Sequence, residues 1–158
     1  VKALINNGRV YSTDVCVPIS KITECVNFAE EQAKKFGVRA PMVGHLGDGN
    51  FHVVLPFDPT KKEMYKKIRA FNDTLIKKAL ELNGTITGEH GVGIEKRELM
   101  CESFNNDDIQ QQLNIKKSLD EKNLLNPGKV YPILRKCAEE GRVHVHRGEE
   151  KFPDLPRF

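Results

Sequence analysis

The chain has 158 residues, of which 39% are hydrophobic and 30% are charged, and its formal net charge is +3. This length suits one domain with a buried core, and the ordinary composition excludes a disordered or fibrous protein. Basic and acidic residues are interleaved, which argues against a nucleic-acid-binding surface, and no apolar run has the length of a transmembrane segment.

The hydrophobic pattern predicts elements in the order strand, helix, strand, strand, helix, strand. Ser20 is expected to cap the first helix and Gly37 to end it, while Asn83 and Gly84 end the second. The predicted elements are a strand at 9–19, a helix at 20–36, two strands within 41–55, a helix that opens at 58–60 and ends at 82, and a strand at 84–89.

This order is the split βαβ pattern of ferredoxin-like α+β folds, in which both helices cover one face of an antiparallel sheet. Two further helices are predicted near 94–104 and 107–122. We therefore expect a domain over residues 1–130 and an irregular C-terminal tail over residues 131–158 that packs on it or extends from it. His144 and His146 in this tail lack a nearby acid or cysteine framework, so no metal site is expected there.

The stretch GHLGDGNFH, residues 44–52, contains two histidines around an Asp-Gly pair. Asp-Gly between strand-like residues predicts a two-residue hairpin turn of type I′ with Asp48 and Gly49 at its centre. His45 would then lie directly opposite His52, with about 5 Å between their Cβ atoms and both rings on the same face. A one-residue change in loop length would separate the two rings.

The two faces of this hairpin differ in character. Alternation places Met42, Leu46, Phe51, Val53 and Leu55 on the face that the helices cover, and Val43, His45, His52 and Val54 on an open face. Two neighbouring imidazoles need a shared polar partner, and a metal ion is one such partner. A stacked or water-bridged histidine pair without metal explains the hairpin equally well.

The segment GTITGEHGVG, residues 84–93, supplies a third candidate ligand, Glu89, beside His90. His45, His52 and Glu89 together would leave coordination positions open, which is typical of a catalytic metal site. His90 would then be free to act as a general base.

Glycines flank this Glu-His pair on both sides. Gly88, Gly91 and Gly93 permit unusual backbone angles and the close approach of a ligand or cofactor. Their GxxGxG spacing differs from the GxGxxG of dinucleotide sites, so they do not predict a dinucleotide-binding motif.

With these motifs in place, the sequence resembles the C-terminal domain of FAD-linked oxidases of the vanillyl-alcohol-oxidase type. Within that family it is similar above all to flavoprotein subunits of bacterial glycolate oxidase and to D-lactate and D-2-hydroxyacid dehydrogenases. The resemblance runs from about residue 9 to the end of the chain and rests on several motifs in the family's order. These are TDVCVPIS at 13–20, GHLGDGNFH at 44–52, GEHGVG at 88–93, LNPGK at 125–129 and DLPRF at 154–158.

The resemblance implies that this domain caps a flavin and shapes the substrate site. The FAD itself would be held by a separate domain upstream of Val1, so the 158 residues alone would be inactive. The implied site residues are His45, His52 and Glu89 for a divalent metal (commonly zinc), His90 as the base, and Asn126 and Gly91 for the flavin.

The implied reaction is the oxidation of a small 2-hydroxy acid, in which the hydride on C2 passes to FAD. Relatives that oxidise dicarboxylic substrates carry a basic residue and an asparagine at the positions of Ser12 and Val54, so the resemblance favours a monocarboxylate such as glycolate or D-lactate. The implied partners are the FAD-binding domain and an iron-sulfur subunit.

The spacing of the cysteines indicates the cellular compartment of the protein. Cys16, Cys25, Cys101 and Cys137 show no CxxC spacing and no dense framework, which favours reduced thiols. We therefore expect a cytoplasmic protein, either free or at the periphery of the inner membrane.

Two other functions remain open from the residues alone. A two-histidine, one-carboxylate set also occurs in non-haem iron oxygenases, although too few strands are predicted for the barrel that usually houses it. The chain could also be a non-catalytic ferredoxin-like binding module in which the histidines are merely packed.

Overall fold

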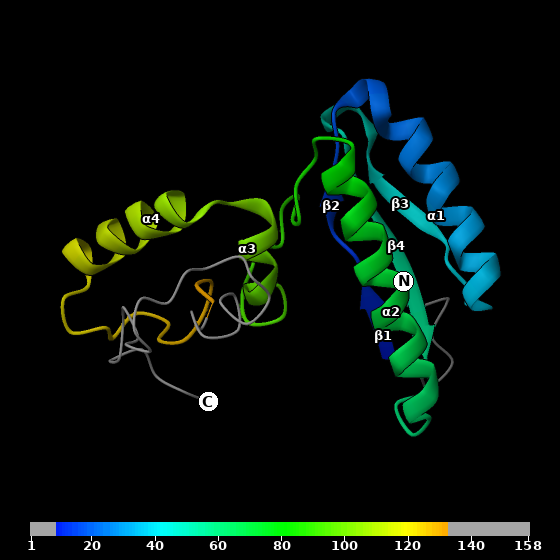
Figure 1. The fold of residues 1–158 in the computed structure, drawn as a ribbon. Helices are drawn as coiled ribbons and strands as arrows, with labels where there is room; N and C mark the ends of the chain where they lie inside the picture. The colour runs from blue at the N-terminus through cyan, green and yellow to red at the C-terminus, as the bar shows by residue number, and fades with distance from the viewer. Residues whose placement is uncertain (1–8, 133–158) are drawn as a thin grey trace. The chain divides into compact units, whose positions relative to one another are not determined.

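The computed structural model describes residues 9–132, and the chain divides after Gly91 into two compact units. Figure 1 shows the elements of both. The first unit contains β1 (Arg9–Ser12), β2 (Val15–Cys16), α1 (Ile22–Phe36), β3 (Met42–His45), β4 (Asn50–Phe57) and α2 (Lys62–Glu81), with 3-10 turns at Ile19–Lys21 and Leu46–Asp48. The second contains a 3-10 turn at Arg97–Leu99, α3 (Met100–Ser103) and α4 (Asn106–Leu119).

The long strand β4 is the centre of an antiparallel sheet. β1 and β2 pair with it in one continuous register, with Ser12 opposite Val54 and Cys16 opposite Asn50, while β3 pairs with its other edge. On the outer side of β2, Thr85 makes a single antiparallel bridge to Cys16. The spatial order is therefore that of a ferredoxin-like sheet, and the predicted α+β class is confirmed.

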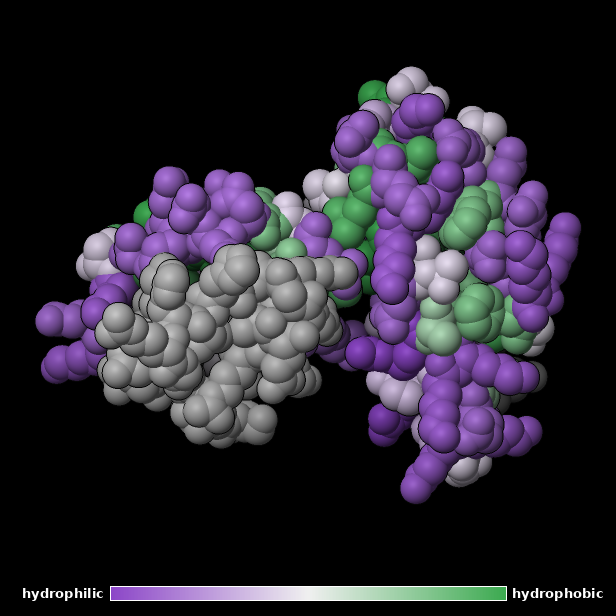
Figure 2. Space-filling view, viewed as in Figure 1, coloured by the Kyte–Doolittle hydropathy of each residue, from purple (hydrophilic) through white to green (hydrophobic). Residues whose placement is uncertain are grey.

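The core lies between the sheet and the helices. Phe51, Val53 and Leu55 alternate along β4 and are at most 1% exposed, as the strand period requires. α2 turns a stripe of buried residues inward, and α1 packs beside it, where the Phe36 ring meets the Phe71 ring edge-on at 6.2 Å. Each fully buried side chain of this size contributes about 1.5–3 kcal/mol. The outer faces of the helices are mainly hydrophilic (Figure 2).

The two predicted helices of this unit are confirmed, but three details of the strands and caps are wrong. The strand expected at 9–19 breaks between β1 and β2, and the segment 84–89 forms only one bridge instead of a strand. Ser20 does not cap α1, whose N-cap is Lys21 without a side-chain hydrogen bond. Gly37 ends α1 at φ 64°, as predicted.

The second unit carries the helices expected after residue 92. α4 begins at an Asn105 cap, whose side chain accepts a hydrogen bond from the N–H of Asp108 at 2.9 Å. The helix predicted near 94–104 is reduced to a 3-10 turn and the single turn of α3. Beyond residue 132, the predicted tail and its two histidines lie outside the described residues.

The thiols differ from the expectation at one position. Cys16 and Cys25 are free, whereas Cys101 is disulfide-bonded, so the prediction of reduced cysteines throughout is wrong there. Cys137 lies outside the described residues. Among the described helices, none combines the length and apolar character needed to span a bilayer.

Candidate metal centre

The hairpin that carries two of the histidines has a longer connection than the predicted two-residue turn. Leu46–Asp48 form a 3-10 turn, and Gly49 follows at φ 77°, a left-handed conformation that suits glycine. His45 is therefore paired with Asn50 instead of His52. The pairing is shifted by two residues, which is one full side-chain period, so both rings still belong to the same face of the sheet.

The predicted division of the hairpin faces is partly correct. Leu46 belongs to the turn and is 57% exposed, so its assignment to the helix-covered face is wrong. The opposite face is not open along its whole length, because His52 and Val54 are only 8% and 3% exposed. The segment that carries Glu89 lies against His52 there, with two side-chain atoms at 3.0 Å.

His52 is held in one protonation pattern by the neighbouring strand. Its Nδ1 lies 3.0 Å from the carbonyl oxygen of Thr13, and because a carbonyl oxygen can only accept, Nδ1 carries a proton. Its Nε2 lies 3.0 Å from Oε1 of Glu89. In a neutral ring this nitrogen presents a lone pair, so a carboxylate oxygen at that distance requires a positive charge between the two atoms, either a proton or a metal ion.

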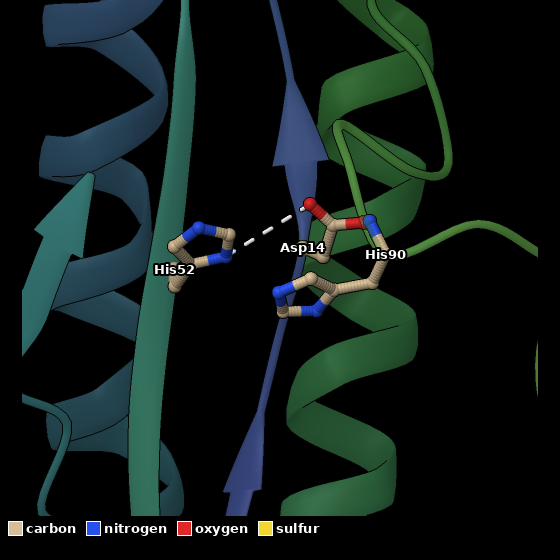
Figure 3. A group of neighbouring side chains, drawn as sticks. All are labelled: Asp14, His52 and His90. Carbon is tan, nitrogen blue, oxygen red and sulfur yellow. Dashed lines mark hydrogen bonds and ion pairs between the residues drawn. The ribbon is translucent and has the colours of Figure 1, made fainter. Parts of the chain in front are cut away.

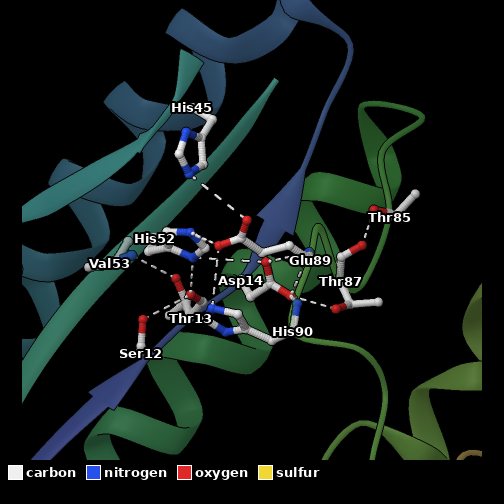
Figure 4. Close-up of polar contacts among 10 residues, drawn as sticks. All are labelled: Ser12, Thr13, Asp14, His45, His52, Val53, Thr85, Thr87, Glu89 and His90. Atoms are coloured by element: carbon white, nitrogen blue, oxygen red, sulfur yellow. Dashed lines mark hydrogen bonds and ion pairs between the residues drawn. The ribbon is translucent and has the colours of Figure 1, made fainter. Parts of the chain in front are cut away.

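Glu89 is the point where the three histidines meet (Figure 4). The second oxygen of its carboxylate, Oε2, lies 3.9 Å from Nε2 of His45, and Oε1 lies 3.6 Å from Nε2 of His90. The ring of His90 also stacks on that of His52, with centroids 4.8 Å apart and planes 5° from parallel. All four of these residues, which the sequence singles out, are thus brought together.

A buried aspartate lies behind this group. Asp14 is 1% exposed, and its carboxylate accepts hydrogen bonds from the N–H groups of Glu89 at 3.1 Å and His90 at 3.0 Å, and from the hydroxyl of Thr87. Its Oδ1 also lies 3.9 Å from Nδ1 of His52 (Figure 3).

Sequence reasoning assigned no role to Thr13, Asp14 or Thr87. The signal for Asp14 was present, because an acidic residue between Thr13 and Val15 interrupts a strand of β-branched residues, and a fully buried acid needs hydrogen-bonding partners. The partners themselves lie more than seventy residues away in the sequence, so no local pattern indicates them.

The donor set fits a divalent cation. Two ligands bound at about 2.1 Å in a tetrahedral zinc site lie about 3.4 Å apart. Nε2 of His52 lies 3.0 Å from Oε1 of Glu89 and Nε2 of His45 lies 3.9 Å from Oε2, and these two separations bracket that value. Nδ1 of His52, committed to Thr13, provides the outer hydrogen bond that metal-bound histidines usually make.

Among the described residues, the set whose ligand atoms already lie close to one another is a different one, which shares only His52 with the ligands expected from the sequence. One atom each from Asp14, His52 and His90 lie within 4.8 Å of one another. The Asp14 carboxylate, however, already accepts from two backbone N–H groups and a hydroxyl, and a bound metal would compete for those lone pairs.

The two residues expected at the flavin occupy unusual backbone positions. Gly91 has φ 79° and open space where a Cβ would stand, which suits close approach of another molecule. Asn126 has φ 48°, and its side-chain oxygen accepts from Nζ of Lys129 at 3.0 Å. Asn126 belongs to the second unit and Gly91 ends the first.

Comparison with known proteins identifies related chains. Residues 2–130 match the family described as FAD linked oxidases, C-terminal domain. The chain is 38% identical over 138 residues to a probable mitochondrial D-lactate dehydrogenase of Danio rerio and 35% identical over 155 residues to the glycolate oxidase subunit GlcD of Escherichia coli K12. It is 37% identical over 127 residues to a mitochondrial D-lactate dehydrogenase (cytochrome) of Kluyveromyces lactis.

These matches cover most of this chain and a smaller part of each relative. They take in 87%, 96% and 80% of the chain, respectively. The matched regions make up 28%, 31% and 22% of the three relatives. The chain therefore spans less than a third of the length of the proteins that it resembles.

Proposed function

Since the chain belongs to the FAD linked oxidases through their C-terminal domain, we propose that it forms the substrate and metal-binding part of a flavin-dependent 2-hydroxyacid oxidoreductase. In this proposal His45, His52 and Glu89 hold a divalent metal, for which we propose zinc, and His90 is the general base. Residues 1–130 form the domain that carries this site. Gly91 and Asn126 are the residues proposed to contact the flavin.

The proposed metal site rests mainly on the contacts of the two ring nitrogens of His52. Nδ1 of His52 is committed to a carbonyl oxygen, while Nε2 faces a carboxylate oxygen of Glu89 at 3.0 Å. This pair calls for a positive charge, and His45 adds a third donor from the same face. Two histidines and one carboxylate leave coordination positions free for a substrate, which distinguishes a catalytic from a structural site.

The remaining histidine has the features of a base. His90 is not needed as a ligand in this set, its side chain is 48% exposed, and its ring stacks on that of His52. A substrate hydroxyl bound beside Glu89 would therefore lie within reach of Nε2 of His90. General bases of this kind must lie within hydrogen-bonding distance of the proton that they remove.

The proposed reaction converts a 2-hydroxy acid to a 2-oxo acid. Nε2 of His90 takes the proton of the 2-hydroxyl, and the electron pair of the C2–H bond leaves as hydride. A divalent cation held by the ligand set supplies Lewis acidity to the hydroxyl, and bound FAD supplies the hydride acceptor.

The substrate proposed is a small monocarboxylate, such as glycolate or D-lactate. Ser12 and Val54 are direct partners across β1 and β4. Both side chains are uncharged, so neither position supplies a group that would bind a second carboxylate. The glycolate oxidase subunit of Escherichia coli and the D-lactate dehydrogenases named above have names that fit this class. A preference for the dicarboxylate D-2-hydroxyglutarate in kcat/KM of the flavin-containing enzyme would contradict this substrate assignment.

Zinc titration of the chelator-treated chain, with metal analysis after dialysis, tests the site directly. We expect one zinc per chain, with affinity strongly reduced in His45→Ala and Glu89→Gln. Glu81→Gln, at the exposed end of α2, is the matched control and should bind as the wild type does. Failure of the wild type to bind zinc, or unchanged binding by Glu89→Gln, would overturn the ligand set.

The partners and the location follow from the same proposal. We propose an FAD-binding domain and an iron-sulfur subunit as partners, and the cytoplasm or the periphery of the inner membrane as the location. Copurification of a subunit with iron-sulfur absorbance tests the second partner.

A further inference from the structure

We propose that Asp14 is a positioning residue of this site: its carboxylate fixes the backbone of residues 87–90 so that Glu89 and His90 face His52. This inference rests on the proposed function, because it concerns how the same site is held in place. It assigns to Asp14 a role other than that of a metal ligand.

The contacts of Asp14 converge on one short segment. Its oxygens accept from the N–H of Glu89, at 3.1 Å to Oδ1 and 3.3 Å to Oδ2, and from the N–H of His90 at 3.0 Å. The hydroxyl of Thr87 donates to the same carboxylate. Two consecutive N–H groups aimed at one side chain fix the peptide plane between them, and with it the directions in which both side chains leave the backbone (Figure 4).

This segment is not held by a strand ladder. The predicted strand at 84–89 is absent, and among the described residues its only backbone pairing with the sheet is the bridge between Thr85 and Cys16, while the side chain of Ile86 is buried in the core. Gly88 lies against the side chain of Asn50, where an added Cβ would be 2.4 Å from Oδ1. Hydrogen bonds to a carboxylate are stronger than those between neutral groups, so Asp14 supplies the missing anchorage.

Asp14 is itself placed by the sheet. Its neighbour Thr13 donates its N–H to the carbonyl oxygen of Val53 at 3.0 Å and accepts from the N–H of Val53 through its hydroxyl at 2.8 Å. The carbonyl oxygen of Thr13 also orients the ring of His52. Two adjacent residues in the break between β1 and β2 thus hold the two parts of the site: Thr13 holds the His52 ring, and Asp14 holds the Glu89–His90 pair.

The buried position of Asp14 favours this role over metal ligation. At 1% exposure its carboxylate is closed off by the groups that donate to it, whereas the side chain of Glu89 is 47% exposed and offers both oxygens to histidine nitrogens. Binding a metal through Oδ2 of Asp14 would displace at least one donor, because this oxygen already accepts from Thr87, Glu89 and His90.

Variants of Asp14 and Thr87 test the proposal on the chain. Asp14→Asn keeps the shape but places an amide NH₂ where acceptors are needed. We expect amide exchange at Glu89 and His90 at least about tenfold faster and zinc affinity about 10–100-fold weaker, as for other outer-shell groups. Exchange at Val53 and Leu55 in β4 should be unchanged, which separates local release from unfolding.

Thr87 distinguishes positioning from ligation. Thr87→Val removes one donor to Asp14 and should weaken zinc binding less than Asp14→Asn, while Thr87→Ser should restore it. A ligand role for Asp14 predicts weaker zinc binding in Thr87→Val without faster amide exchange at Glu89 and His90, because the hydrogen bond would then tune a ligand instead of holding a backbone. That result would overturn the proposal, and the two Thr87 variants can provide it if Asp14→Asn fails to fold.

The outcomes separate this inference from the proposed function. Wild-type zinc affinity and amide exchange in Asp14→Asn, with zinc lost in Glu89→Gln, would overturn the role of Asp14 and leave the metal site standing. If the wild type binds no zinc, the ligand set fails, and faster exchange at Glu89 and His90 in metal-free Asp14→Asn would still support the anchoring role.

Discussion

The site is assembled from two regions that are held in very different ways. His52 lies on β4 and is 8% exposed, and Asp14 lies in the short link between β1 and β2 and is 1% exposed. Glu89 and His90 stand on a segment without regular structure, and their side chains are 47% and 48% exposed. The sheet region therefore sets the register, whereas the segment region relies on a few anchors and is the part open to a substrate.

The strongest test breaks the register of the sheet region. Deletion of Gly47, which has open space around it, shortens the hairpin connection by one residue and would turn His45 to the other face. We expect zinc affinity to fall by more than the roughly 100-fold upper limit for loss of an outer-shell partner. Isothermal titration checks this, and circular dichroism checks that the fold persists. Wild-type affinity in the deletion variant would show that His45 is not a ligand.

A smaller effect is expected when only the contact between the segment region and β4 is changed. Gly88→Ala puts a Cβ 2.4 Å from Oδ1 of Asn50, so either the amide of Asn50 or the segment must shift. We expect zinc affinity to fall by about tenfold, which corresponds to about 1.4 kcal/mol.

Two variants serve as controls for this displacement. Gly47→Ala meets nothing within 4 Å and should bind as the wild type does. Asn50→Ala combined with Gly88→Ala removes the clashing amide and should recover part of the affinity, in a double-mutant cycle with a favourable coupling term. Additive losses would mean that the Gly88–Asn50 contact does not set the position of the segment.

The smallest difference between variant and wild type is expected at the buried thiol of Cys25, whose slow reactivity is a property of the sheet region. Burial raises the pKa of Cys25 in α1 from 9.0 to about 11. Since the thiolate is the nucleophile, the thiolate fraction at pH 8 is about 100-fold lower than in an unperturbed thiol, and alkylation should speed up about tenfold per pH unit until the pKa is reached.

Alkylation of Cys25 in the Gly88→Ala variant tests whether the sheet region and the segment region respond independently. Peptide mapping of iodoacetamide-treated protein should show the same slow labelling of Cys25 in the variant and in the wild type, because only the contact between the segment region and β4 has changed. Faster labelling in the variant would show that the two regions do not respond independently.

Sequence reasoning recovers the sheet region better than the segment region. The alternation in Phe51, Val53 and Leu55 and the helical stripe of α2 follow directly from side-chain periodicity, so the α+β fold could be predicted. The predicted turn is wrong, but the pairing differs by two residues, so the prediction that His45 and His52 lie on the same face is still correct.

The segment region shows where such reasoning stops. The alternation of threonine and isoleucine at 85–87 has the pattern of a strand, but the N–H groups that follow are taken by Asp14 instead of a sheet partner. A buried side-chain acceptor can replace a strand ladder, and its choice of donors depends on tertiary contacts that no local window contains.

The adjacency of Thr13 and Asp14 has a consequence for motion. Because the ring of His52 and the peptide of Glu89 and His90 are hydrogen-bonded to adjacent residues, a displacement of residues 13–14 would shift both parts of the site in the same direction.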